Sequence, residues 1–191
     1  AMRRGAKIPR DKVMLLSKIW SREPDVARSD LDRMRKELNT DCIDVVLMHC
    51  LRGGEENWPE TLKGTMDMLS EAKAKGWIRA HGVSCHNLKA FERVPDEEWV
   101  DVVLARINPF GVRMDGPAEV IAPTLQKIHD AGKGVLGMKI LGEGDPKVVN
   151  KMNESLKFVA ELGSMDAMTI GFLNKGELDD VKNRIASVAT A

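Results

Sequence analysis

Apolar runs and amphipathic stretches alternate along the chain, and this pattern predicts a parallel sheet covered by helices. Short runs that are apolar almost throughout are typical of strands buried on both faces. The predicted strands span Val13–Trp20, Ile43–Cys50, Trp77–His86, Asp101–Asn108, Gly134–Leu141 and Met165–Phe172. Stretches with a single apolar stripe separate these runs, as expected for helices packed on a sheet. The fold class is therefore α/β.

Each predicted strand is followed by a predicted helix, which gives six strand and helix units. In the first helix the apolar stripe consists of Ala27, Leu31, Met34 and Leu38. The other helices are expected over residues 58–75, 88–93, 118–131, 146–162 and 175–189. A closed eight-unit barrel needs about 250 residues. Length alone therefore favours an open, doubly wound sheet for these 191 residues.

Composition adds a single-domain prediction and narrows the choice of partner. A chain of 191 residues can bury one sizeable core, so we expect one domain over residues 1–191. The 29 Lys and Arg residues balance 29 Asp and Glu residues, and no block of like charge stands out. Neither nucleic acid nor a membrane is therefore expected as a partner. The expected partner is therefore a small molecule bound by individual side chains.

Cysteine usage indicates a reducing compartment. The three cysteines Cys42, Cys50 and Cys85 are odd in number and lack a C-x-x-C spacing. A disulfide framework is therefore not expected, and we predict a cytoplasmic location. The sequence shows neither an apolar run of membrane-spanning length nor a signal-peptide pattern.

Two titratable side chains stand near the ends of the first two predicted strands. The carboxyl ends of parallel strands gather reactive groups, so Lys18 and His49 are expected to lie next to one another above the sheet. A snorkelling surface lysine and a histidine bonded to a backbone carbonyl are the alternative interpretations. The pairs His49-Cys50 and Cys85-His86 also allow a metal site, although adjacent strand residues face opposite ways. We therefore predict no metal.

Four segments, taken in order, resemble the aldo/keto reductase family. They are VMLLSKIW, IDVVLMHC, GWIRAHGVSCHN and GVLGMKILGEG. GWIRAHGVS is similar to the family's Gly-Lys-Ile-Arg-Ala-Ile-Gly-Val-Ser segment, and ILGEG to its Pro-Leu-Gly-x-Gly. The resemblance runs from about Val13 to Val188 and implies a (β/α)8 TIM barrel of which this chain carries about six units, the third to the eighth. We therefore expect an N-terminally truncated member, either preceded by further residues or read from part of a longer gene.

The resemblance also implies the chemistry, which is hydride transfer from NADPH to an aldehyde or ketone. Lys18 would match the lysine that lowers the pKa of the catalytic tyrosine, and His49 the histidine that polarises the substrate oxygen. Ser84 would hold the nicotinamide carboxamide, and Met138 would stand where an aromatic ring usually stacks on the nicotinamide. The remaining cofactor residues would be Leu141, Gly142 and Gly144 by the pyrophosphate, and Gly171 and Lys175 by the adenosine phosphate.

Departures from the family pattern leave three interpretations open. The sequence has no tyrosine, so an impaired reductase is the first. The second is a non-catalytic nucleotide-binding or subunit-like domain of the same fold. The third is a different barrel enzyme with Lys18 as a Schiff-base nucleophile. In each, the first and last predicted strands are open edges, which a homo-oligomer would cover.

Overall fold

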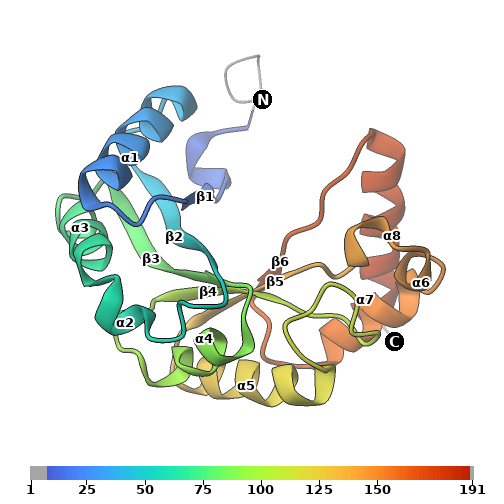
Figure 1. Ribbon diagram of the computed structural model, residues 1–191. Coiled ribbons are helices and arrows are strands. Elements are labelled where there is room, and N and C mark those ends of the chain that lie inside the picture. Colours follow the sequence, from blue (N-terminus) through green and yellow to red (C-terminus); the bar gives the residue numbers. More distant parts are fainter. Residues whose placement is uncertain (1–7, 190–191) are drawn as a thin grey trace.

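The computed structural model describes residues 8–189, and its centre is a six-stranded parallel sheet (Figure 1). The strands follow one another in sequence order across the sheet, and all five pairings are parallel. They are β1 (Leu16–Ile19), β2 (Ile43–Leu51), β3 (Ile78–Cys85), β4 (Val102–Arg106), β5 (Gly134–Met138) and β6 (Ala167–Met168). The prediction of an α/β fold is confirmed, and the sequential order is that of a barrel rather than of a doubly wound sheet.

Helices cover the outer face of the curved sheet in Figure 1. They are α1 (Pro24–Leu38), α2 (Trp58–Thr61), α3 (Lys63–Ala74), α4 (Leu88–Glu92), α5 (Ala118–Asp130), α6 (Pro146–Val149), α7 (Met152–Glu161) and α8 (Lys175–Ala189). Short 3-10 turns lie at Arg10–Lys12, Val94–Asp96 and Gly142–Gly144. No helix within residues 8–189 combines the length and the apolar character that crossing a bilayer requires.

Two predicted helices are each divided in two. The helix predicted over residues 58–75 breaks at Leu62, where φ is −108° and ψ is 20°. The helix predicted over residues 146–162 breaks at Lys151, where φ is −126° and ψ is 35°. In α2, Trp58 is fully buried and its indole N–H donates to the Ala90 carbonyl at 3.1 Å. An apolar stripe indicates which face of a helix is buried, but it does not show whether the backbone runs unbroken.

Alternation along the strands separates a large core from a small one. In β2, Val46 and Met48 belong to the large core under the helices, whereas Val45 and Leu47 belong to the small cluster. Successive side chains on a strand point to opposite faces, so the small cluster lies on the face turned away from the helices. Its buried members are Val45, Leu47, Leu104, Leu136 and Met138. The side chains at the strand ends lie next to this inner apolar face.

The sheet has two open edges within the described residues, as the sequence predicts. β1 and β6 end the strand order, and neither pairs with a further strand in residues 8–189. Figure 1 shows the resulting arc, open between β1 and β6. β6 is only two residues long, and single backbone hydrogen bonds from Asp166 and Thr169 to β5 continue the pairing on either side.

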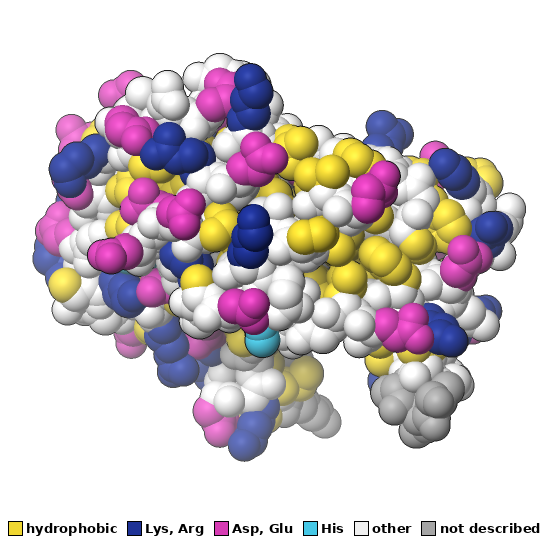
Figure 2. All heavy atoms as spheres, turned by 90° about the horizontal axis from the view of Figure 1, so that it is seen from below, with side chains coloured by type: hydrophobic (Ala, Val, Ile, Leu, Met, Phe, Trp, Pro, Cys, Tyr) yellow, Lys and Arg dark blue, Asp and Glu magenta, His cyan; other side chains and the backbone are white. Residues whose placement is uncertain are grey.

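Charge is distributed unevenly over the surface. Figure 2, seen from below, shows acidic and basic side chains crowded over the left part, where α2 and α3 lie in Figure 1, and hydrophobic side chains gathered nearer the middle. Ion pairs account for part of the charged area, among them Lys63–Asp67 at 2.9 Å and Lys75–Glu71 at 2.5 Å on α3. This part of the surface is a solvated helix face on which acidic and basic side chains pair with one another.

Candidate active site

A cavity of about 970 Å³ lies at the carboxyl ends of β1, β4, β5 and β6. Its walls come from segments that are far apart in sequence, which is the arrangement expected of a site at strand ends. Five of the nine residues that the sequence analysis assigned to a site line this cavity, namely Lys18, Met138, Leu141, Gly144 and Gly171. Leu104, at the centre of β4, also lines it. The cavity is therefore the candidate active site.

Lys18 brings an amine to the wall of this cavity. It lies on β1 two residues after Leu16, so both side chains point to the inner face of the sheet. Within residues 8–189 the structure gives the Lys18 amine no hydrogen bond and no carboxylate partner. Burial is the largest cause that lowers the pKa of Lys18, and the positive charge of Lys139 lowers it further. The interaction with Cys50 acts in the opposite direction. Burial removes water from the ammonium group, so the charged form of Lys18 is less favourable than that of an exposed lysine.

His49 stands beside Lys18, because β1 and β2 are neighbours in the sheet. Burial, followed by the charges of Lys18, His86 and Arg22, lowers the pKa of His49 to about 4. The Trp20 ring meets the imidazole edge to face, with ring centroids 5.2 Å apart. At neutral pH His49 is therefore an uncharged imidazole, the form that can donate one hydrogen bond without carrying charge.

The coupling between Lys18 and His49 gives a direct prediction. In the Lys18→Met variant the pKa of His49 is expected to rise from about 4 toward its ordinary value, because one of the charges that opposes imidazole protonation is gone. An NMR titration of the His49 ring proton measures this midpoint. Lys63→Met is the matched control, since Lys63 is exposed on α3 and pairs with Asp67. A His49 midpoint that stays the same in Lys18→Met would show that the two side chains are not coupled.

Ser84 is placed differently from the cavity-lining residues. Its side chain is fully buried on β3, and its hydroxyl oxygen accepts a hydrogen bond from the backbone N–H of Cys50 at 2.9 Å. Cys50 itself has a left-handed backbone, with φ of 61°. Ser84 thus ties the end of β2 to β3 in this structure, and its predicted contact with a carboxamide stays a prediction.

A tight turn after β5 forms a second wall. Gly142, Glu143 and Gly144 all have left-handed φ angles of 60°, 60° and 83°. Gly142 is buried and does not line the cavity, and a Cβ on it would lie 2.6 Å from the Val148 side chain. Gly144 has open space around it. Lys139 forms an ion pair with Glu143, so the base of the turn carries a neutralised charge pair.

The start of α8 forms the third wall, and it is acidic on the cavity side. Glu177 and Asp180 line the cavity together with Phe172 and Leu173, whereas Lys175 does not. The Glu177 carboxylate accepts hydrogen bonds from the Leu173 backbone N–H and the Asn174 side-chain amide, both at 2.8 Å. It therefore caps the start of the helix next to the cavity.

Two ion pairs that support the strand ends were missed by sequence reasoning. Arg106 at the end of β4 forms a two-pronged pair with Asp115, whose side chain is only 4% exposed. Arg22 pairs with Glu55 at 2.7 Å and also donates to the backbone carbonyl of His49 at 2.8 Å. Arg106 lies inside the strand predicted over Asp101–Asn108, but its partner lies nine residues further on in a loop. No local pattern points to such a pair.

The metal alternative finds no support within residues 8–189. No group of three His, Cys, Asp or Glu side chains in this part of the chain is arranged to hold a metal ion. Cys85 is fully buried, and burial raises the pKa of its thiol, which disfavours the thiolate that a metal requires. The His49 and His86 rings lie edge to face with centroids 6.2 Å apart.

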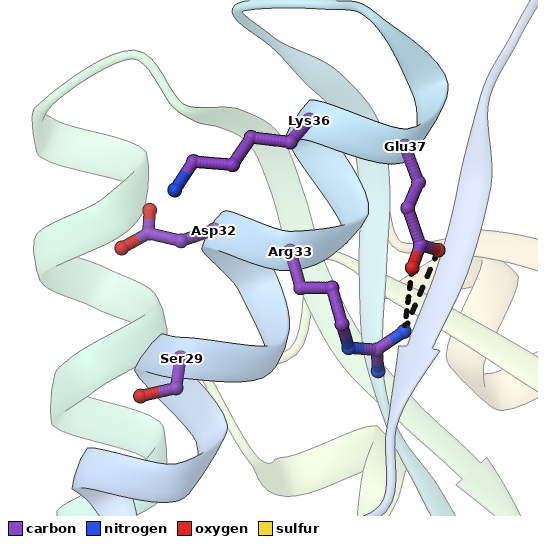
Figure 3. Close-up of a pocket in the computed structure, with 5 residues that line it drawn as sticks. All are labelled: Ser29, Asp32, Arg33, Lys36 and Glu37. Carbon is purple, nitrogen blue, oxygen red and sulfur yellow. Dashed lines mark hydrogen bonds and ion pairs between the residues drawn. The ribbon is translucent and has the colours of Figure 1, made fainter.

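A second hollow, of about 410 Å³, lies on the outer face of α1 (Figure 3). Figure 3 shows Arg33 reaching toward Glu37, and this pair is 3.3 Å long. Arg33 also pairs with Asp30 at 2.9 Å. The hydrogen bonds to Asp30 and Glu37 raise the pKa of Arg33, as expected when a cation gains acidic neighbours. The hollow is a charged helix face remote from the strand ends, and it carries no catalytic group.

Comparison with known proteins places this arrangement in a family. The aldo/keto reductase family model matches residues 1–158. The chain is 28% identical over 103 residues to aldo-keto reductase family 1 member C21 of Mus musculus, which covers 46% of this chain and 32% of that protein. It is 23% identical over 145 residues to methylglyoxal reductase of Escherichia coli O157:H7, which covers 72% of this chain and 51% of the other.

Solved structures agree with the architecture. An aldo-keto reductase of Bacillus halodurans in its holo form superposes with a TM-score of 0.73 at 15% identity, over 94% of this chain and 68% of the other. This likeness shows the fold, a partial (β/α)8 barrel. The chain spans about half the length of the Escherichia coli relative and about a third of the mouse relative. Because the family model covers most of the sequence, this chain belongs to the aldo/keto reductase family.

Proposed function

We propose that the protein reduces aldehyde or ketone carbonyls with NADPH, with Lys18 and His49 at the reacting oxygen. The observation that carries this proposal is that Lys18 lines one cavity with Met138, Leu141, Gly144 and Gly171, while His49 lies near enough for the Lys18 charge to lower its pKa. Methylglyoxal, the substrate named for the Escherichia coli relative, represents the class of small carbonyl compound in question.

The cavity fits a nicotinamide dinucleotide in size and backbone geometry. Its volume of about 970 Å³ is at the upper end for small-molecule sites. No heavy atom comes within 4 Å of where a Cβ would stand on Gly144 or Gly171, so a ligand can approach their backbone closely. Met138 would cover the nicotinamide, Leu141 and Gly144 would lie by the pyrophosphate, and Lys175 would lie by the adenosine phosphate. NADPH supplies a hydride to the carbonyl carbon when bound.

The chain's own residues would act on the carbonyl oxygen. An uncharged His49 imidazole can donate a hydrogen bond to that oxygen and strengthen it as negative charge develops. The Lys18 ammonium places positive charge near the same atom. A tyrosine that would protonate the alkoxide is absent from the sequence, and general acid catalysis is typically worth about 10²–10⁴ in rate. We therefore expect this chain to bind the cofactor better than it turns it over.

The missing tyrosine also favours a second candidate, a nucleotide-binding domain without catalysis. Such a domain would keep the cavity and lose turnover altogether. For either candidate we infer a reducing, cytoplasmic setting from the free thiols of Cys42, Cys50 and Cys85. A second copy that covers β1 and β6 remains our prediction for the open edges.

A titration with NADPH and NADH tests the proposal. We expect saturable binding, seen in nicotinamide fluorescence and in quenching of Trp20, Trp58, Trp77 and Trp99. The Glu177→Gln variant is expected to bind NADPH several-fold more tightly and NADH about equally, because it removes a negative charge that would repel the 2′-phosphate. Gln keeps much of the helix-capping ability of Glu.

The outcomes separate the candidates. Binding with slow methylglyoxal reduction supports an impaired reductase, and binding with no reduction at all supports the non-catalytic domain. If neither nucleotide binds up to millimolar concentration, both candidates are wrong for this chain. If Glu177→Gln leaves NADPH affinity unchanged, the α8 end of the cavity does not receive the 2′-phosphate.

A further inference from the structure

The Lys18 amine lies among groups that lower its pKa. It is half-buried on the inner face of β1, and no carboxylate within residues 8–189 pairs with it. The groups that face it are another cation, Lys139, the thiol of Cys50 and the rings of His49 and His86. Glu143, an acid that also lines the cavity, is paired with Lys139. These surroundings lower the pKa of the Lys18 amine, so at a given pH a larger fraction of it is neutral than for an exposed lysine.

The amine also has room in front of it. Lys18 lines the cavity together with apolar side chains, among them Leu104, Met138, Ile140 and Met152. A small aldehyde can therefore reach the nitrogen through a space of about 970 Å³. An apolar wall beside an amine of lowered pKa is the setting in which lysine acts as a nucleophile toward carbonyl carbon.

We propose that Lys18 captures small aldehydes covalently as an imine at the wall of this cavity. The nitrogen lone pair attacks the carbonyl carbon, a C–N bond forms, and the carbonyl π electrons move to oxygen, which takes a proton. The carbinolamine then loses water, and the nitrogen gives up its remaining proton to yield the neutral imine. The sum is amine plus aldehyde giving imine plus water, so no oxidant or reductant is consumed. His49, held neutral, can accept and return the protons.

This reaction does not depend on a nicotinamide cofactor. It uses the Lys18 nitrogen, the space in front of it and the neighbouring imidazole, and no step in it uses a bound nucleotide. Failure of cofactor binding therefore leaves the imine proposal standing. Conversely, an unreactive Lys18 leaves the reductase proposal untouched.

Reductive labelling tests the proposal on the full chain. Propionaldehyde with cyanoborohydride converts each imine to a stable propyl-lysine, which peptide mass spectrometry locates and quantifies. At pH 7 we expect Lys18 to be labelled several-fold faster than Lys63, whose side chain is 73% exposed and therefore sterically freer. Equal or slower labelling of Lys18 would overturn the proposal. In Lys18→Met this label should vanish while labelling of Lys63 stays constant.

The pH dependence provides a second measurement that needs no variant. The labelling rate of Lys18 is expected to rise at lower pH than that of Lys63, because burial and Lys139 lower its pKa. Lys139→Gln should move the Lys18 curve toward the Lys63 curve, and Lys157→Gln, an exposed lysine on α7, should not. Superimposable curves for Lys18 and Lys63 in the unmodified protein would show that the amine is not activated.

Discussion

Asp115→Asn is expected to lower the free energy of unfolding by about 3–5 kcal/mol, because it leaves the Arg106 guanidinium buried without its counter-charge. The pair is two-pronged, with Arg106 Nε donating to one Asp115 oxygen at 3.1 Å and Nη2 donating to the other. Both side chains are well shielded, 17% and 4% exposed. Urea unfolding followed by circular dichroism measures the loss.

Asp67→Asn is the matched control for this change. Asp67 pairs with Lys63 at 2.9 Å on the exposed face of α3, where both side chains are more than half exposed. Exposed pairs of this kind contribute at most about 0.5 kcal/mol. If Asp115→Asn costs no more than Asp67→Asn, the Arg106–Asp115 pair does not stabilise the β4 end of the site. Replacing both partners with Met and Leu should restore part of the stability, since no charge is then left unpaired.

Gly82→Ala is the second large effect, with an expected loss of about 3 kcal/mol, near the upper end for overpacking. A Cβ on Gly82 would lie 1.8 Å from the backbone carbonyl oxygen of Val102. The neighbouring atom belongs to the backbone of β4, so it cannot rotate away as a side chain does. β3 and β4 share the register Gly82–Val102, Val83–Val103 and Ser84–Leu104, and separating the strands disturbs all three pairs.

Gly53→Ala controls for the general effect of replacing glycine. Gly53 lies in the loop after β2, where no heavy atom comes within 4 Å of the position that a Cβ would take. A glycine replaced without strain changes stability by a few tenths of a kcal/mol, often upward. Urea midpoints of the two variants give the comparison. Equal midpoints would mean that β3 and β4 can separate at no cost, contrary to the close approach at Gly82.

The sequence predicted the existence and order of the elements well, because each depends on local periodicity. The helix over residues 175–189 has the predicted bounds. The strand predicted over Val13–Trp20 pairs only over Leu16–Ile19, because an apolar run records burial and not hydrogen bonding. The breaks at Leu62 and Lys151 were missed for the same reason.

The candidate site was partly predictable. Lys18 and Met138 line the cavity because strand ends of a parallel sheet meet at one edge, which the sequence pattern already implies. Ser84 and Gly142 are buried instead, the first against Cys50 and the second against Val148. The acidic Glu177 at the α8 wall could not be predicted, since its orientation depends on a hydrogen bond to Leu173 that no motif indicates.

Because the sheet is an open arc, the width of the cavity depends on the twist of the sheet. Its lining includes Lys18 on the first strand and Thr169 to Gly171 just after the last strand, so the two free margins of the sheet both reach the same space. Strand twist accumulates from one pairing to the next. A small change at each of the five pairings therefore adds up across the arc and widens or narrows the cavity as a whole. A molecule that contacts both free margins would therefore restrict this change in width, and its binding would change the curvature of the sheet.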